Sequence, residues 1–259
     1  MMVKTLAIQA LYFGLALWMM NMLARRINKF IIRQFGWDSF VIFGTPGTWF
    51  HEAAHAVTAR LFGIRVEEFS PCHFDRASGI LGYVKTRVDQ SSKLQTTGFI
   101  LSAIAPLPLG LLFLYLLSNM LIPNVVDLKQ LGIFALERLP EANFGESCTV
   151  VGLFVSTVLG SLQYPGFWLF SVTSLLICAQ IVPSLQDLKM MLPGILAFAL
   201  ILAFIGHLPK LHFMWPKIIK LSIVSNLAMT FACLQMMAAY LLFKSANFII
   251  RALKKRGAS

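Results

Sequence analysis

Long stretches of the chain carry no charged side chain, and they set the expected architecture. Five stretches lack Asp, Glu, Lys and Arg: Thr5–Ala24, Thr97–Val126, Thr149–Gln186, Met190–Pro209 and Leu221–Phe243. A helix needs about 20 largely apolar residues to cross the hydrocarbon core of a bilayer. The pattern therefore predicts an α-helical polytopic membrane protein with about six transmembrane helices.

Polar and helix-breaking residues give the expected boundaries. Gly63 should cap the second helix, and Pro106 and Pro108 should kink the third. Six spans place the basic clusters 25–33 and 244–256 on opposite sides of the membrane, whereas seven place them on one side, so the number of spans and the orientation stay open. The predicted segments are helices at about 5–24, 40–63, 97–122, 166–182, 188–206 and 218–243, a basic amphipathic connector at 25–38, and a shallow or re-entrant helix ending near 162.

Residues 64–95 form the longest segment of mixed polarity, and within the chain this segment alone has the composition of β-strands. Residues 64–69 and 80–88 are rich in β-branched and aromatic side chains, and Pro71 and a Ser-Gly pair lie between them. We therefore expect a β-hairpin or small sheet after the second helix.

The composition supports a membrane protein and excludes several other classes. Apolar residues make up 58% of the chain and charged residues 13%, against about 25% charged residues in a typical soluble domain. The formal net charge is +11, but the basic residues follow apolar stretches. We therefore expect contact with anionic lipid of the bilayer and no nucleic acid.

The cysteines and the first helix carry no motif of their own. The four cysteines form no CxxC pair, which argues against a redox or zinc-cysteine motif. Cys178 and Cys233 lie in apolar stretches and are expected to be packing residues. Residues 1–24 should remain as an uncleaved helix, because Arg25 and Arg26 follow them in place of small residues.

The second predicted helix contains His51-Glu52-Ala53-Ala54-His55, which matches the HExxH pattern. Residues four apart lie on one face of a helix, so both imidazoles can reach one metal ion. Glu52 projects about 100° away from His51, where it can take a proton from water at that ion but is badly placed as a ligand. Because ionisable groups within a span are costly and mark functional sites, we expect Zn²⁺ bound by His51 and His55, with Glu52 as the catalytic base.

A catalytic zinc ion takes three protein ligands, so one more ligand must come from elsewhere. Asp187 is favoured, because it follows the 38-residue uncharged stretch and the helix-breaking Pro183, where a carboxylate can dip toward the membrane. Alternatively, Asp187 is an interfacial carboxylate balanced by Lys189. The other candidates are Asp75, Asp89, Asp127, Glu137, Glu141, Glu146, His73, His207 and His212.

Further motifs follow the HExxH helix in a defined order. Gly82-Tyr83-Val84 lies in the strand-rich segment, a Pro-Leu-Pro-Leu-Gly sequence from Pro106 lies in the next apolar helix, and Asp187 follows a later span. Over about residues 40–190 this order resembles the site-2 protease family of intramembrane zinc metalloproteases. In that family HExxH supplies two ligands and the base, and a later Leu-Asp-Gly supplies the third ligand. Asp187 lacks that glycine, and the family's Asn after a Gly-Pro pair has no clear counterpart, which indicates a divergent member.

The resemblance implies a zinc metalloendopeptidase that hydrolyses membrane-protein or membrane-inserted peptide substrates. Gly82, Tyr83 and Val84 would then contact the substrate, and the hairpin edge could pair with it as an added strand. No PDZ-like domain is expected, because the predicted extramembrane loop at 123–147 is too short for one. The expected organisation is a single membrane-embedded domain at 1–259 with its catalytic core at about 40–190, in a bacterial plasma membrane.

Other functional classes fit the sequence less well. A di-iron desaturase or hydroxylase is excluded, because such sites consume more histidines than the five present. The main alternative is a proteolytically silent membrane protein that acts as a transporter subunit or scaffold. Such a protein would explain the helices and the basic ends, but not the HExxH pattern. The substrate, its cleavage site and the oligomeric state are not predicted.

Overall fold

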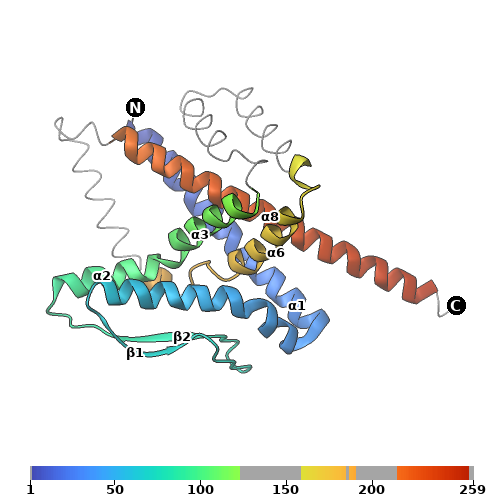
Figure 1. Ribbon diagram of the computed structural model, residues 1–259, viewed down its shortest axis with the longest axis horizontal. Helices are drawn as coiled ribbons and strands as arrows, with labels where there is room; N and C mark the ends of the chain where they lie inside the picture. Colours follow the sequence, from blue (N-terminus) through green and yellow to red (C-terminus); the bar gives the residue numbers. More distant parts are fainter. Residues whose placement is uncertain (1, 123–158, 185–186, 191–214, 257–259) are drawn as a thin grey trace.

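The computed structural model describes residues 2–122, 159–184, 187–190 and 215–256, which are mostly helical (Figure 1). The expected combination of an α-helical chain with a small β-hairpin is confirmed. The elements in chain order are α1 (Met2–Leu61), β1 (Arg65–Ser70), β2 (Tyr83–Arg87), α2 (Lys93–Ile104), α3 (Pro106–Leu121), α6 (Pro165–Cys178) and α8 (Trp215–Arg256).

Several predicted features lie outside the described residues. These are the extramembrane loop at 123–147, the shallow helix before residue 159 and the predicted helix beyond residue 190. The candidate ligands that fall there are Asp127, Glu137, Glu141, Glu146, His207 and His212.

Helix α1 runs through the segment that was expected to be a separate connector. It breaks only at Gly36, whose φ of 86° and ψ of 176° are not helical. At this point the chain turns back, and the second half of α1 leads to the hairpin (Figure 1). The boundary predicted at residue 24 is therefore wrong, because Ile27 and Ile31 continue the buried stripe of α1 beyond it.

The end of α1 at Leu61 follows the predicted glycine cap. Gly63 has a φ of 70°, a left-handed conformation that glycine adopts without strain. The Gly63 N–H donates to the Arg60 carbonyl at 3.0 Å, and the Ile64 N–H donates to the Ala59 carbonyl at 3.0 Å. These two bonds form a Schellman motif, with Ile64 buried against the helix.

Strands β1 and β2 form the expected antiparallel hairpin, with Ser70 opposite Tyr83 and Arg65 opposite Arg87. The second strand begins at Tyr83, later than predicted, because Ile80 forms an isolated bridge with Asp75 across the connecting turn. On the exposed face, Lys85 and Tyr83 donate hydrogen bonds to the Glu68 carboxylate and hold the pKa of Glu68 below its usual range.

The apolar segment after the hairpin forms two helices where one kinked helix was expected. Helix α2 begins after the cap residue Ser92 and ends at Ile104, and α3 begins at Pro106. The proline cannot continue α2, because it lacks an N–H and its ring clashes with the preceding turn. The two helices meet at 54°.

The length and apolar character of each described helix decide whether it could cross a membrane. Within the described residues, none of the helices is by itself both long and apolar enough for a membrane crossing. The bent pair α2–α3 meets both criteria together, and α6 is a shorter apolar helix.

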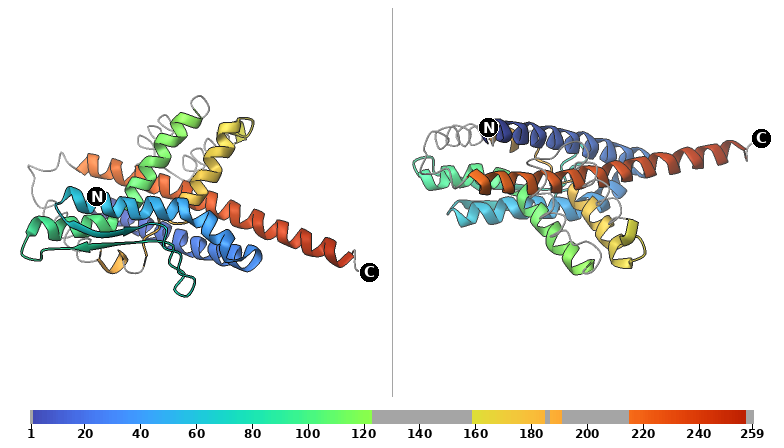
Figure 2. Two further views of the ribbon diagram at one scale, coloured as in Figure 1. Left: turned by 60° about the horizontal axis from the view of Figure 1, so that its bottom comes forward. Right: turned by 90° about the horizontal axis from the view of Figure 1, so that it is seen from above.

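The core lies where the first half of α1 packs along α8. This core includes Met20 and Ile27 of α1 and Met229 and Met236 of α8, and all four are almost completely buried. Helices α3 and α6 project from one side of this pair (Figure 2). Helix α8 continues to Arg256, through the basic cluster expected to lie beyond a helix ending near 243.

Two cysteines lie in this core, as expected for packing residues. Cys178 and Cys233 are both 0% exposed. The Cys233 thiol also donates to the carbonyl of Ala16 at 3.4 Å, which ties α8 to α1.

Candidate metal centre

Two imidazoles project together from the second half of α1. His51 and His55 are one helical turn apart, and their rings meet edge to face with centroids 4.6 Å apart. The two Nε2 atoms lie 2.9 Å apart. The HExxH spacing therefore brings one nitrogen of each ring to a common point, as the helical period requires.

The third member of the group comes from a turn 132 residues further along the chain than His55. Asp187 is 5% exposed and faces both histidines. Its Oδ2 lies 3.5 Å from His51 Nε2, and its Oδ1 lies 3.5 Å from His55 Nε2. The structure thus places together the three residues that the sequence favoured as ligands.

The separations between these three side chains fit a shared ion. Ligand atoms at about 2.0–2.1 Å from a tetrahedral zinc ion lie about 3.3 Å from one another. The three pairs described above are separated by 2.9, 3.5 and 3.5 Å. His51, His55 and Asp187 could therefore hold a metal ion.

Comparison of the chain with protein-family models, with curated proteins and with solved structures gives no match.

A hydrogen bond on the far side of His55 fixes its orientation. His55 Nδ1 lies 2.7 Å from the carbonyl oxygen of Ser102 on α2. The carbonyl can only accept, so Nδ1 carries the proton and Nε2 presents its lone pair to the metal position. Such a backbone partner sets the tautomer of many metal-binding histidines. His51 Nδ1 is buried and has no such partner among the described residues.

Asp187 is held by a cap at the start of the helical turn in which it lies. The Ser184 N–H donates to Asp187 Oδ2 at 2.7 Å, and the Asp187 N–H donates to Ser184 Oγ at 3.1 Å. This reciprocal pair is a capping box, with the acidic residue three positions after the serine. The cap leaves Oδ1 free to face His55, so the same carboxylate caps its helix and completes the group.

Close packing brings the two parts of the group together. Gly47 lies one turn before His51, and a Cβ there would overlap the Leu176 carbonyl and lie 2.8 Å from the side chain of Gln180. The lack of a side chain therefore lets α1 approach the end of α6, from which the chain continues to Asp187. Neither Gly47 nor Ser184 was predicted to shape the site, although the Ser-x-x-Asp spacing is a capping signal in the sequence.

Glu52 lies beside the three-residue group but does not belong to it. It is half-buried, next to His51 along the helix, and close enough to His51 and Asp187 to interact electrostatically with both. No hydrogen bond or ion pair engages its carboxylate within the described residues. Glu52 is therefore available to accept a proton from a molecule bound at the metal position.

The hairpin residues predicted to contact substrate lie outside the triad. Gly82 packs against the backbone of Pro71. Tyr83 and Val84 pair with Ser70 and Phe69 of β1. Their role in substrate binding stays a prediction.

Three other candidate ligands belong to the hairpin and its exit. Asp75 and Asp89 accept hydrogen bonds from residues of their own exposed turns, and His73 packs edge to face against Tyr83. None of the three joins His51 and His55 in the group that the described residues form.

Removing the Ser184 hydroxyl should weaken metal binding. We expect Ser184→Ala to lower the metal affinity by about 10–100-fold, the usual effect of losing a group that orients a ligand, whereas Ser184→Thr should retain most of it. Competition with a chromophoric chelator measures the affinity. Ser78→Ala is the matched control, because Ser78 bonds Asp75 in the hairpin turn. Unchanged affinity in Ser184→Ala would show that the cap does not position Asp187.

Proposed function

We propose that the protein is an intramembrane zinc metalloprotease, a divergent relative of the site-2 protease family. The observation that carries this proposal is the convergence of His51, His55 and Asp187, with an unengaged Glu52 beside them. Two imidazoles and one carboxylate form a ligand set that zinc hydrolases use, with a fourth position left for water or substrate.

The residues around the site take separate roles in peptide hydrolysis. When bound, zinc supplies Lewis-acid chemistry to water and to the peptide carbonyl. His51, His55 and Asp187 hold the ion, and the Ser102 carbonyl keeps His55 in the required tautomer. Glu52 accepts the proton of the attacking water and delivers it to the leaving amine, the usual work of a general acid–base group.

A membrane location is supported by the surface of the helices as well as by the uncharged stretches. Large apolar side chains are exposed along α1, α3, α6 and α8, including Leu11, Trp18, Met120, Trp168 and Leu242. Extended apolar surfaces of this kind mark contacts with lipid or with a partner. We propose a multi-pass protein of a bacterial plasma membrane, with the lipid bilayer around these side chains.

The proposed substrates are membrane proteins or membrane-inserted peptides. A transmembrane helix buries its amides in its own hydrogen bonds, so cleavage requires local unwinding to an extended strand. The hairpin is suited to receive such a strand, because each strand of a two-stranded sheet has one unpaired edge. In this proposal Gly82, Tyr83 and Val84 contact the substrate from β2 or from the turn before it.

Metal removal tests the proposed activity. We expect cleavage of a membrane-protein substrate by the reconstituted protein to stop after treatment with a zinc chelator and to return when zinc is added back, because the metal site would then be emptied and refilled. Gel analysis of the substrate fragments measures the rate. Protein that binds zinc fully but cleaves none of a panel of membrane-protein substrates would favour the silent transporter subunit or scaffold.

A further inference from the structure

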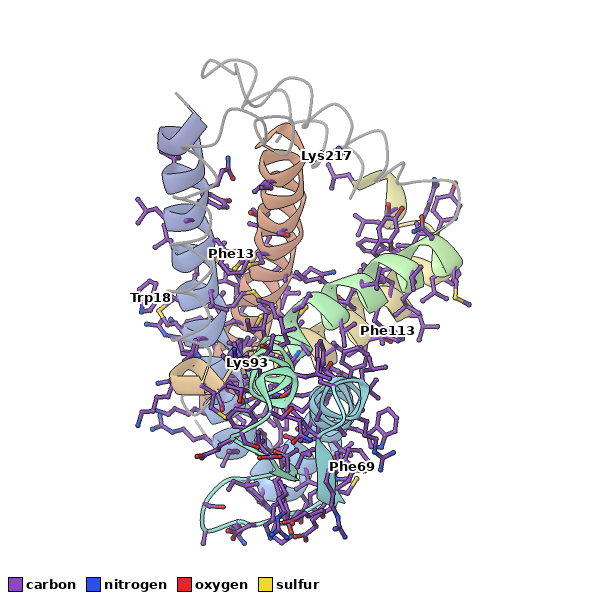
Figure 3. The ribbon with its side chains drawn as sticks, turned by 90° about the vertical axis from the view of Figure 1, so that its left-hand side faces the viewer. Phe13, Trp18, Phe69, Lys93, Phe113 and Lys217 are labelled. Carbon is purple, nitrogen blue, oxygen red and sulfur yellow. The ribbon has the colours of Figure 1, made fainter. Side chains whose placement is uncertain are left out.

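Helix α1 has two different faces over its first half. One face carries Ala16, Met20, Leu23 and Ile27 into the core shared with α8. Figure 3 shows Phe13 on the side of α1 toward α8 and Trp18 on the outer side. The outer face borders a cavity of about 510 Å³, whose lining includes Gly14, Leu17, Trp18, Arg25, Arg26 and Lys29.

The lining of this cavity changes character along the helix axis. Gly14, Leu17 and Trp18 form an apolar end, and Arg25, Arg26 and Lys29 form a cationic end. The rise of 1.5 Å per residue places Gly14 and Lys29 about 22 Å apart along the axis. The part of α1 that lines the cavity is therefore apolar toward Gly14 and cationic toward Lys29.

The three cations have no acidic partner in the part of the chain that the structure describes. Within the described residues, Arg25, Arg26 and Lys29 make no ion pair, and no acidic side chain lines the cavity. Clustered like charges repel one another, so this end is suited to an anion. A single phosphate can accept hydrogen bonds from several such donors.

The apolar end has room for a chain. A Cβ built on Gly14 meets no atom within 4 Å, and Trp18 is 62% exposed. A free phosphate would leave the space beside Gly14 and Trp18 unfilled, whereas a lipid fills both ends. We propose that the cavity binds one anionic phospholipid, with its phosphate at Arg25, Arg26 and Lys29 and an acyl chain along Leu17 and Trp18.

The bound lipid would touch the turn that carries the third candidate ligand. Pro183 and Leu188 line the cavity on either side of Asp187, and the Asn21 side chain donates to the Pro183 carbonyl at 3.4 Å. The turn lies against α1 in Figure 3. A lipid bound in the cavity would therefore stabilise this turn. This proposal goes beyond the proposed protease activity and does not depend on it.

Native mass spectrometry of the purified full chain tests the proposal. The probes are phosphatidylglycerol and phosphatidylcholine with identical acyl chains, so that only the headgroup charge differs. We expect one retained phosphatidylglycerol per chain and at least about tenfold weaker retention of phosphatidylcholine, because each nearby cation strengthens binding of an anionic lipid several-fold. Inorganic phosphate should not displace the lipid.

Two variants separate the two ends of the cavity. The triple variant Arg25→Gln, Arg26→Gln, Lys29→Gln should lose the headgroup preference, by up to about 100-fold. Gly14→Leu should lower retention by occupying the apolar end, where an added Cβ meets no atom within 4 Å. The control Arg65→Gln, Arg76→Gln, Lys93→Gln removes three exposed cations elsewhere and should bind as wild type does. Equal retention of both lipids, wild-type binding by either cavity variant, or displacement by phosphate would overturn the proposal. The readout needs neither zinc nor proteolysis, so it fails or succeeds separately from the proposed function.

Discussion

Replacing Glu52 with glutamine should lower the rate of peptide hydrolysis by about 10²–10⁴-fold, the usual contribution of a general acid–base group. Glutamine keeps the size of the side chain but cannot accept the proton of the attacking water. The metal should stay bound, because Glu52 is not among the three residues that could hold it. The measurements are the rate of substrate cleavage and the zinc content of the same preparation.

The matched control for this variant is Glu67→Gln, which changes an exposed glutamate of the hairpin. Its cleavage rate should equal that of the wild type. Undiminished cleavage by Glu52→Gln would remove Glu52 from the mechanism. Loss of zinc from Glu52→Gln together with loss of cleavage would show that Glu52 supports the metal site and would contradict its assignment as the base alone.

Changing the ligands should empty the site. We expect His51→Ala to lower the zinc content from about one ion per chain to below about one tenth, because two protein ligands cannot hold a catalytic zinc ion tightly. Asp187→Asn should weaken binding strongly as well, since the amide has the same shape but lacks the negative charge. Elemental analysis of purified protein after dialysis measures the zinc content.

Two controls remove the same groups from other positions. His73→Ala and Asp75→Asn change side chains of the hairpin region, and both variants should retain about one zinc ion per chain. Zinc binding by Asp187→Asn that is as tight as in wild type would show that another residue is the third ligand. Retention of zinc by His51→Ala would contradict the site as a whole.

The helical half of the metal site could be predicted from sequence because it depends on local geometry. His51 and His55 are four residues apart on one helix, so the spacing alone places both rings on one face. The hairpin could be predicted for the same reason, since alternating β-branched residues and a central turn specify it locally. The start of β2 was missed, because the Asp75–Ile80 bridge depends on how the connecting turn closes.

The position of Asp187 depends on contacts across long sequence distances. The sequence favoured it for its place after an uncharged stretch, but could not show that it faces His51. That arrangement depends on the approach of α1 to α6 at Gly47 and on the cap made by Ser184. The Ser184 cap could be predicted from the Ser-x-x-Asp spacing. The close approach of α1 to α6 at Gly47 could not, because it depends on how the two helices pack.

The predicted helix boundaries were wrong where polar residues were interpreted as the ends of helices. Lys29 and its basic neighbours indicated an interfacial connector, yet α1 continues to the glycine at position 36. Long basic side chains can lie along a helix whose opposite face is buried, so charge alone does not end it. Pro106, by contrast, was expected to kink a single helix, whereas the structure has two helices, α2 and α3, that meet there.

Zinc X-ray absorption spectroscopy of the purified wild-type protein tests the central claim most directly. Ligation by His51, His55 and Asp187 predicts nitrogen and oxygen neighbours at about 2.0–2.1 Å, outer-shell scattering from two imidazoles, and no sulfur at about 2.3 Å. A sulfur neighbour, the absence of imidazole scattering, or protein that binds no zinc would contradict the claim.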